Sequence, residues 1–185
     1  MDKFLKSTLL FISLLLLPGM ATAEDLYFKP YLGGGLGGFL LSNGAGDNWV
    51  FGGYGSVGAE VLPILAFEGR VGSAANASNA TSTFGIDYFI AGYAKPQYKI
   101  EGMKINIYGL FGVSSVSSWS KPTGGLTVTR TVQSFSYGAG VEFYATDNII
   151  LGVEGMVLDG QDKSALATYH GNYAAGAVGT IRISF

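Results

Sequence analysis

Alternation of apolar and polar residues is the feature of this sequence that most constrains its fold. It recurs in eight segments, which are residues 27–38, 49–61, 65–73, 83–95, 104–114, 134–144, 149–157 and 172–185. Successive side chains of a β-strand point to opposite faces, so each segment predicts a strand with one apolar and one polar face. The sequence therefore predicts an all-β protein whose strands are paired with one another.

Charged residues occupy only one of the two faces of these segments. They are Lys29, Arg70, Lys95, Lys104 and Arg182 together with Glu60, Glu68, Asp87, Glu142 and Glu154. A charge that faces lipid costs about 2–4 kcal/mol at the middle of a bilayer. This segregation predicts strands whose apolar face meets lipid and whose charged face lines an interior. A soluble eight-stranded barrel of lipocalin type would show the reverse, with its apolar face inside.

Long and short connections alternate along the chain. The long ones are residues 39–48, 74–82, 115–130 and 158–170, and the short ones are 62–64, 101–102 and 145–148. Outer-membrane barrels combine short periplasmic turns with long extracellular loops. We therefore expect an eight-stranded antiparallel transmembrane β-barrel, an up-and-down meander with both ends of the chain in the periplasm.

Pro96 leaves the end of the fourth strand open, because proline removes a hydrogen bond from the ladder. The strand either ends there or continues to Ile100, with a hairpin at Glu101 and Gly102. The sequence does not decide between these alternatives.

The first 23 residues resemble a secretory signal peptide. Lys3 and Lys6 precede an apolar run from Leu9 to Leu17, and the small residues of 21–23 follow as a cleavage site. The apolar run is shorter than the roughly 20 residues of a spanning helix. We expect residues 1–23 to be removed and residues 24–185 to form the barrel domain in the outer membrane.

Composition excludes several other functions. The chain has no cysteine, one histidine and a formal net charge of −2, without a basic tract. Disulfides and cysteine-based zinc sites are therefore absent, and nucleic acid is not an expected partner. The close-set glycines of 33–38 lie within a strand and precede no helix, so they do not predict a nucleotide site. We expect no cofactor and no metal site.

Three sequence motifs carry a resemblance to a known family. They are KPYLGGGLGG at 29–38, FSYGAGVEFYATDNIILGVEG at 135–155 and IRISF at 181–185. Through them the chain resembles the small OmpA/OmpX-like outer-membrane β-barrel proteins of Gram-negative bacteria. The resemblance covers the whole mature chain.

The resemblance implies a location and partners. It implies a monomer in outer-membrane lipid and lipopolysaccharide, delivered by periplasmic chaperones and inserted by the barrel-assembly machinery. Ile181, Ile183 and Phe185 resemble the terminal signal that this machinery reads. It does not specify an activity, because this fold carries adhesins, structural anchors and a few enzymes.

The ten interior charges are the main candidate site. Eight strands enclose a lumen that side chains only just fill, so we expect the five acidic and five basic residues to form an interior ion-pair network. A narrow channel is the alternative. We expect a structural or adhesin-like role in surface interaction, carried by the extracellular loops, with Trp119 as a candidate for stacking on carbohydrate.

His170 raises an enzymatic alternative, a hydrolase or transferase that acts on the acyl chains of lipid A. It is predicted to lie near Asp159, Asp162 and Ser164, and a nucleophile needs such a base and a group that orients it. However, Gly171 and Asn172 follow His170, so the adjacent serine of the deacylase pattern is missing. We therefore expect no catalytic residue.

Overall fold

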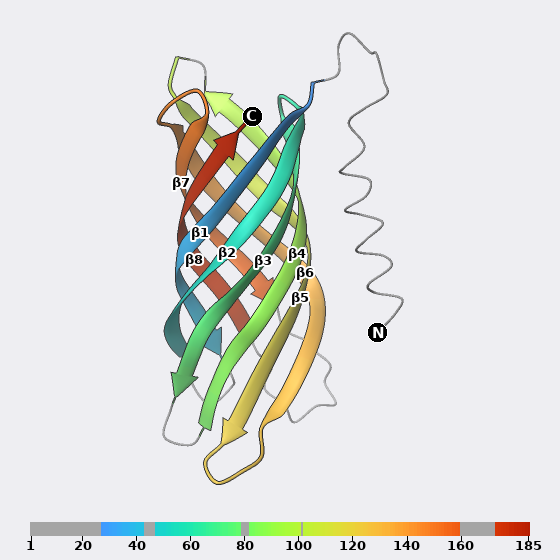
Figure 1. Ribbon diagram of the computed structural model, residues 1–185, viewed down its shortest axis with the longest axis vertical. Coiled ribbons are helices and arrows are strands. Elements are labelled where there is room, and N and C mark those ends of the chain that lie inside the picture. Colours follow the sequence, from blue (N-terminus) through green and yellow to red (C-terminus); the bar gives the residue numbers. More distant parts are fainter. Residues whose placement is uncertain (1–26, 43–46, 79–81, 101, 160–172) are drawn as a thin grey trace.

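Eight antiparallel strands form a closed barrel in the computed structural model, which describes residues 27–42, 47–78, 82–100, 102–159 and 173–185 (Figure 1). The strands are β1 (Lys29–Ser42), β2 (Asp47–Leu62), β3 (Leu65–Ser78), β4 (Ser82–Ile100), β5 (Ile105–Pro122), β6 (Val128–Tyr144), β7 (Ile149–Asp159) and β8 (Tyr173–Ser184). Each strand pairs with the next, and β1 pairs with β8 from Tyr31 opposite Ser184 to Ser42 opposite Tyr173. The predicted eight-stranded meander is confirmed.

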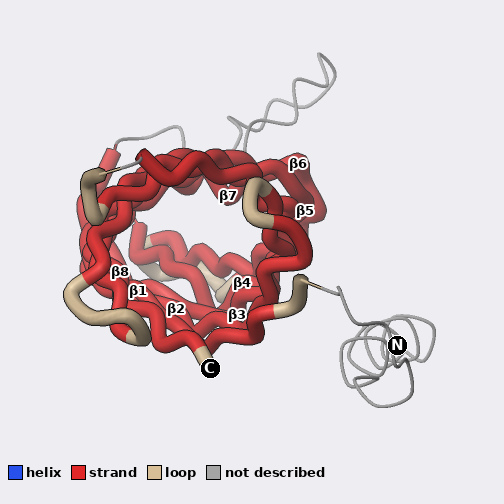
Figure 2. Tube along the Cα trace, turned by 90° about the horizontal axis from the view of Figure 1, so that it is seen from above, coloured by secondary structure: helices blue, strands red, loops and turns tan. Residues whose placement is uncertain are grey.

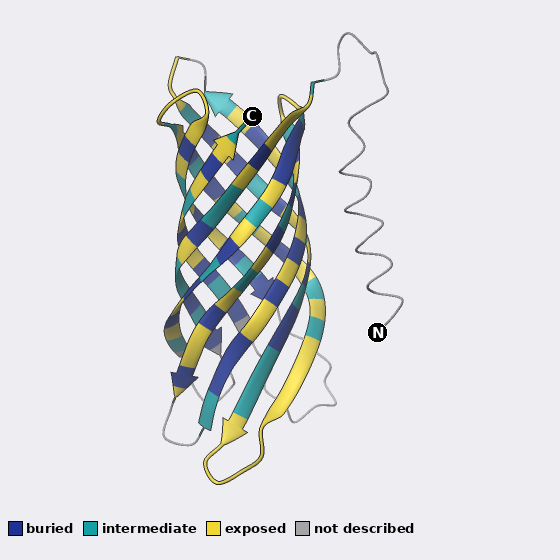
Figure 3. Cartoon of the chain, in the orientation of Figure 1, coloured by how far each residue is buried: buried dark blue, intermediate teal, exposed yellow. Residues whose placement is uncertain are grey.

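Seen along the barrel axis, the described strands form a single ring (Figure 2). Buried and exposed residues alternate over much of the strands, whereas the loop-end part of β6 is exposed throughout (Figure 3). In β1, for example, Leu32 and Leu36 are exposed on the outer wall, whereas Tyr31 is buried. The described residues contain no helix with the length and hydropathy needed to cross a bilayer.

The barrel has two different ends, which we call the turn end and the loop end. The turn end carries the connections between β2 and β3, β4 and β5, and β6 and β7, together with Phe185. The loop end carries the connections between β1 and β2, β3 and β4, β5 and β6, and β7 and β8.

Strands extend further at the loop end than the alternation predicts. The segment 115–130, expected to be a loop, is mostly a hairpin of β5 and β6, which pair from Ile105 opposite Phe143 to Ser120 opposite Val128. This hairpin projects beyond the other strands in Figure 1. The hairpin is rich in serine and threonine and has no apolar face toward lipid. The alternation of apolar and polar residues therefore did not reveal its strands. The expected loop at 158–170 lies largely outside the described residues.

Strand β4 continues through Pro96 to Ile100, which decides the alternative that the sequence left open. Pro96 pairs with Leu65 of β3. The ladder to β5 is interrupted at Lys95 and Pro96, and it resumes at Gln97 opposite Tyr108 without a change of register. The absence of a backbone N–H at Pro96 therefore causes only a local gap in the ladder between β4 and β5.

A β-bulge in β4 reverses the faces of its loop-end half. The register with β5 shifts between Ile86 and Tyr88. Phe84 and Ile86 consequently lie inside the barrel, whereas Asp87 and Tyr88 are exposed. Regular alternation assigns Phe84 and Ile86 to the outside and Asp87 to the inside, and the bulge corrects this assignment because one extra residue exchanges the two faces beyond it.

Candidate functional site

The turn-end half of the barrel interior holds eight charged side chains in alternating order, which we call the lumen network. In order of contact they are Glu154, Arg70, Glu68, Lys95, Glu142, Arg182, Glu60 and Lys99. The successive nitrogen–oxygen distances are 2.5, 2.7, 3.8, 2.6, 3.0, 3.1 and 3.3 Å. Four carboxylates and four cations balance, so the network is electrically neutral.

Strand geometry explains why these residues meet. They stand at inward-facing positions of β2, β3, β4, β6, β7 and β8, and the closed ring brings the six strands around one axis. Seven of the eight residues are buried, and Lys99, at the turn end, has a side chain that is 39% exposed. The network therefore runs from the middle of the barrel to the mouth at its turn end.

Neutral donors complete the hydrogen bonding of the carboxylates. Tyr31 donates to Glu68 over 2.8 Å, and Tyr108 donates to Glu154 over the same distance. Asn106 donates to Glu142 over 2.9 Å. Buried charges are tolerated only when such additional bonds satisfy them. Because Tyr31 belongs to β1 and the other two donors to β5, all eight strands contribute to the network and its donors.

Tyrosine rings also cover the cations of the network. The guanidinium carbon of Arg70 lies 4.4 Å from the centre of the Tyr54 ring, and Nζ of Lys95 lies 3.9 Å from that of Tyr108. Cation–π contacts of this kind contribute up to about 2 kcal/mol when they are desolvated. The alternation places these tyrosines inside, but nothing in it identifies them as partners of the charges.

Seven of the ten charges that the sequence assigns to the interior belong to the lumen network, and three do not. Lys29 is exposed at the start of β1, with its Nζ 5.0 Å from the centre of the Tyr27 ring. Lys104 is exposed in the turn that precedes β5, and Asp87 is exposed beside the bulge of β4. Lys99 was missed because Pro96 obscured the end of β4.

The loop-end half of the interior is apolar, and we call this cluster the apolar plug. It consists of Phe39, Leu41, Val50, Tyr54, Ala74, Ala77, Phe84, Ile86, Phe89, Val116, Met156, Leu158, Ala174 and Val178. Phe39 and Phe89 are fully buried, with ring centres 6.1 Å apart. The plug separates the lumen network from the loop end of the barrel.

Little space remains inside the barrel. A cavity of about 10 Å³ is lined mainly by members and donors of the lumen network, including Glu68, Lys95 and Tyr108. Such a volume accommodates about one water molecule. Nor do the described residues contain a group of three or more His, Asp or Glu side chains placed to hold a metal ion. Packed and charge-paired side chains thus occupy the described interior.

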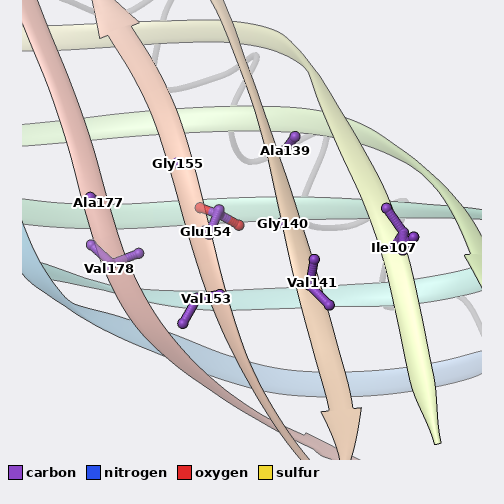
Figure 4. A pocket seen from close by; sticks show the side chains of 9 residues that line it. All are labelled: Ile107, Ala139, Gly140, Val141, Val153, Glu154, Gly155, Ala177 and Val178. Atoms are coloured by element: carbon purple, nitrogen blue, oxygen red, sulfur yellow. The ribbon is translucent and has the colours of Figure 1, made fainter. Parts of the chain in front are cut away.

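A shallow depression of about 600 Å³ lies on the outer wall across β5 to β8 (Figure 4). The small residues Ala139, Gly155 and Ala177 pair across β6, β7 and β8 and leave this space, and Ile107 and Val153 border it. These five residues belong to the outward-facing set of their strands. The depression is therefore open to the surroundings of the barrel, and Glu154 of the lumen network is also among its lining residues.

At the loop end of the β5–β6 hairpin, the edge of β6 that faces away from β5 extends beyond its described ladder with β7. Strand β6 pairs with β5 as far as Val128, but its ladder with β7 begins only at Tyr137 opposite Val157. Ser134 and Ser136 cap part of this edge by donating to backbone carbonyls of β7. Over residues 128–133, no strand among the described residues pairs with β6 on this edge, whereas β5 pairs with it on the other edge.

The enzymatic alternative concerns residues that lie mostly outside the described part of the chain. His170, Asp162 and Ser164 lie outside the described residues, and Asp159 ends β7. Trp119 is half-buried in β5, opposite Thr129 of β6. It therefore belongs to the projecting hairpin.

Known proteins share this architecture. Residues 9–181 match the model of the outer membrane protein beta-barrel domain, whereas no curated protein matches the chain. Neisserial surface protein A (NspA) superposes with a TM-score of 0.65 at 17% identity, covering 85% of this chain and 97% of that one. Ail, the attachment invasion locus protein of Yersinia pestis, was solved in complex with the heparin analogue sucrose octasulfate. It superposes with a TM-score of 0.60 at 13% identity, covering 86% of this chain and 100% of that one.

The N-terminal β-barrel domain of Pseudomonas aeruginosa OprF gives a TM-score of 0.56 at 14% identity, covering 86% of this chain and 98% of that domain. At these identities the likeness concerns the fold. It agrees with the closed eight-stranded barrel described above.

Proposed function

Because the chain belongs to the family of outer membrane proteins with a beta-barrel domain, we propose that its barrel is an outer-membrane anchor that presents the β5–β6 hairpin to a partner outside the cell. The observation that carries this proposal is the projecting β5–β6 hairpin, which is exposed over residues 121–131 and in which β6 extends beyond its described ladder with β7. Unpaired strand edges are templates for pairing with another chain, and proteins usually blunt them. A projecting edge therefore favours a role in surface interaction.

The chemistry of the hairpin suggests the kind of partner. Lys121 and Arg130 are exposed on it, and no acidic residue occurs between Gly102 and Val141. An extended, acidic segment of a partner protein would add a strand to β6, with backbone hydrogen bonds that supply affinity and charges that supply steering. We propose strand addition of this kind as the binding mode.

The filled interior supports binding over transport. The apolar plug occupies the loop-end half of the interior, and the cavity lined mainly by the lumen network has a volume of about 10 Å³. We infer that the interior stabilises the barrel and does not conduct. Planar-bilayer recordings of the purified protein test this inference, since regular conductance steps would favour the narrow channel instead.

An adhesion assay tests the proposed function. Cells that display the full chain are applied to immobilised extracellular matrix proteins, and the double variant Thr129→Asp/Thr131→Asp is compared with the unchanged chain. Both threonines are exposed on β6, so the new carboxylates should repel an acidic partner and reduce adhesion several-fold. The matched control is Ala145→Asp, an exposed residue at the turn end. Equal adhesion of all three proteins would refute the proposal.

A sulfated glycan is the second candidate partner. The basic hairpin with its half-buried Trp119 favours it, and the solved structure of Ail contains a heparin analogue. Heparin added to the adhesion assay separates the two candidates. Competition by heparin that is lost in Lys121→Ala would favour the glycan.

We further infer a non-catalytic role and assembly as a monomer. Mass spectrometry of lipid A from cells with and without the gene tests the first point, because an acyl hydrolase or transferase would change the mass of lipid A. Sedimentation in detergent tests the second. N-terminal sequencing of the outer-membrane form tests the removal of residues 1–23.

A further inference from the structure

The turn between β2 and β3 has no polar side chain. It consists of Pro63 and Ile64 and follows Leu62, the last residue of β2; all three are exposed, and Ile64 has 65% of its surface accessible. The turn between β6 and β7 is different, because its residues 145–148 include the exposed polar residues Asp147 and Asn148. An exposed apolar tip is unfavourable in water and favourable in lipid.

The apolar outer face of β3 is shorter than those of β5 and β6, which also favours a lipid environment for the turn. In β5 this face extends from Ile105 to Val113 before Ser115, and in β6 from Phe143 to Phe135 before Gln133. In β3 it extends only over 65–71, because the next outward residue is Ser73. A tilted strand needs about 9–11 residues to cross a bilayer. The crossing of β3 reaches this length only when residues of the turn are included.

The backbone of the turn is satisfied from within the barrel. The backbone N–H of Gln97 donates to the carbonyl of Ile64 over 2.9 Å, and its side-chain amide donates to the carbonyl of Pro63 over 3.3 Å. Gln97 is itself buried, with 5% of its surface accessible. Lipid offers no hydrogen-bond partner, so backbone groups at that depth must be satisfied internally. The contacts of Gln97 meet this requirement for two carbonyls of the turn.

We propose that Leu62, Pro63 and Ile64 are immersed in the phospholipid leaflet at the turn end, as a continuation of the lipid-facing belt of β3. The belt reaches the turn without interruption through Leu65 and Phe67, and no charged side chain faces outward between Val61 and Val71. The barrel is then anchored more deeply on the side of β2 and β3 than on the side of β6 and β7.

Site-directed labelling tests the depth of the turn directly, because the chain contains no cysteine. The single variants Leu62→Cys, Ile64→Cys and Asp147→Cys of the full chain are labelled with bimane and placed in nanodiscs of phosphatidylcholine and phosphatidylglycerol, which leave both ends of the barrel accessible. Iodide quenches labels in water, and lipids brominated near the headgroup quench labels in the leaflet. Asp147→Cys is the matched control in a polar turn.

We expect iodide to quench the labels at 62 and 64 several-fold less than the label at 147, and brominated lipid to show the opposite order. Heat-modifiable gel mobility verifies that each labelled barrel is folded. Equal iodide quenching at all three positions would overturn the proposal. It would place the apolar turn in water, where a periplasmic protein rather than lipid would be its partner.

Discussion

At the scale of single residues, Arg70 makes contacts with several strands from its place in the lumen network. Its Nε donates to Glu68 over 2.7 Å, and its two terminal nitrogens donate to Glu154 over 2.5 and 2.8 Å. Its guanidinium also lies within 5.0 Å of the centre of the Tyr93 ring. Arg70 therefore joins β3 to β7 across the lumen.

We predict that Arg70→Ala lowers the free energy of unfolding by about 3–5 kcal/mol, the cost of leaving a buried charge without its partner. Arg70→Lys should also destabilise the barrel, because lysine cannot make the bidentate contact with Glu154. Urea unfolding of the protein in lipid vesicles measures both effects. Lys121→Ala, at an exposed position, is the control and should change stability by less than about 0.5 kcal/mol. Equal effects of Arg70→Ala and Lys121→Ala would mean that water reaches the network.

The sequence identifies most members of the lumen network because it shows both the charge of a residue and its place in the alternation, which determines whether it faces inward. It does not identify Lys99, whose parity depends on whether β4 continues beyond Pro96. It also misplaces Lys104, since the boundary between a turn and a strand shifts by one residue without changing the pattern. Which carboxylate meets which cation depends on the register across six strands, which single-strand patterns do not contain.

At the scale of elements, the bulge of β4 is the feature that alternation could not predict. Apolar residues occupy 84, 86, 88 and 90, so the segment looks like one continuous apolar face. The structure divides it, with Phe84 and Ile86 in the apolar plug and Tyr88 and Ile90 exposed outside. The apolar side chains fit either face, and packing against the plug decides between them.

This division predicts different costs for two neighbouring substitutions. Phe84→Ala should lower the free energy of unfolding by about 3–5 kcal/mol, because it opens a cavity in a packed cluster. Asp87→Asn should change it by less than about 0.5 kcal/mol, since the side chain is exposed. Thermal unfolding in the same lipid measures both. A large loss of stability in Asp87→Asn would indicate that the Asp87 side chain lies in the interior and would contradict the bulge.

Strand β8 carries the residues that resemble an assembly signal. Ile181, Ile183 and Phe185 are all exposed on the outer wall, and the N–H of Phe185 donates to the carbonyl of Pro30 over 3.1 Å. Phe185 therefore also takes part in closing β8 against β1. Unpaired backbone groups cost several kcal/mol each in hydrocarbon.

We predict that deletion of Phe185, or Phe185→Asp, prevents normal insertion, so that processed protein accumulates in the periplasm or is degraded. Ser184→Ala, on the opposite face, should assemble almost normally. Heat-modifiable gel mobility of outer-membrane fractions measures the amount of folded barrel. A normal amount of heat-modifiable protein without Phe185 would show that the residue neither directs nor closes the barrel.

At the scale of the whole molecule, the interior and the outer wall of the barrel exchange polarity along the barrel axis. In the turn-end half the interior is charged and the outer wall is apolar. Toward the loop end the interior is the apolar plug, whereas outward positions such as Ser73, Ser115 and Gln133 are polar. A bilayer requires an apolar outer wall, and water requires a polar one. The exchange therefore marks the height at which the strands leave the membrane.

This exchange explains why the sequence predicted the membrane-spanning part of the fold and not its extension. The prediction rested on a polar interior, which holds only where lipid surrounds the barrel. Val116 and Ser117 are both buried where β5 leaves the lipid-facing pattern, so strict alternation fails there. The projecting hairpin, which carries the proposed binding edge, thus lay in a region expected to be a loop.

The direction of the exchange predicts the orientation of the barrel. The projecting, polar loop end should face the outside of the cell, and the turn end should face the periplasm. An epitope inserted between Gly124 and Gly125 should then be detected by antibody on intact cells, because both glycines lie in an exposed turn where insertions are tolerated. The same epitope inserted between Asp147 and Asn148 should be detected only after the outer membrane is permeabilised. Detection of the second epitope alone on intact cells would mean that the orientation is inverted and that the β5–β6 hairpin lies in the periplasm.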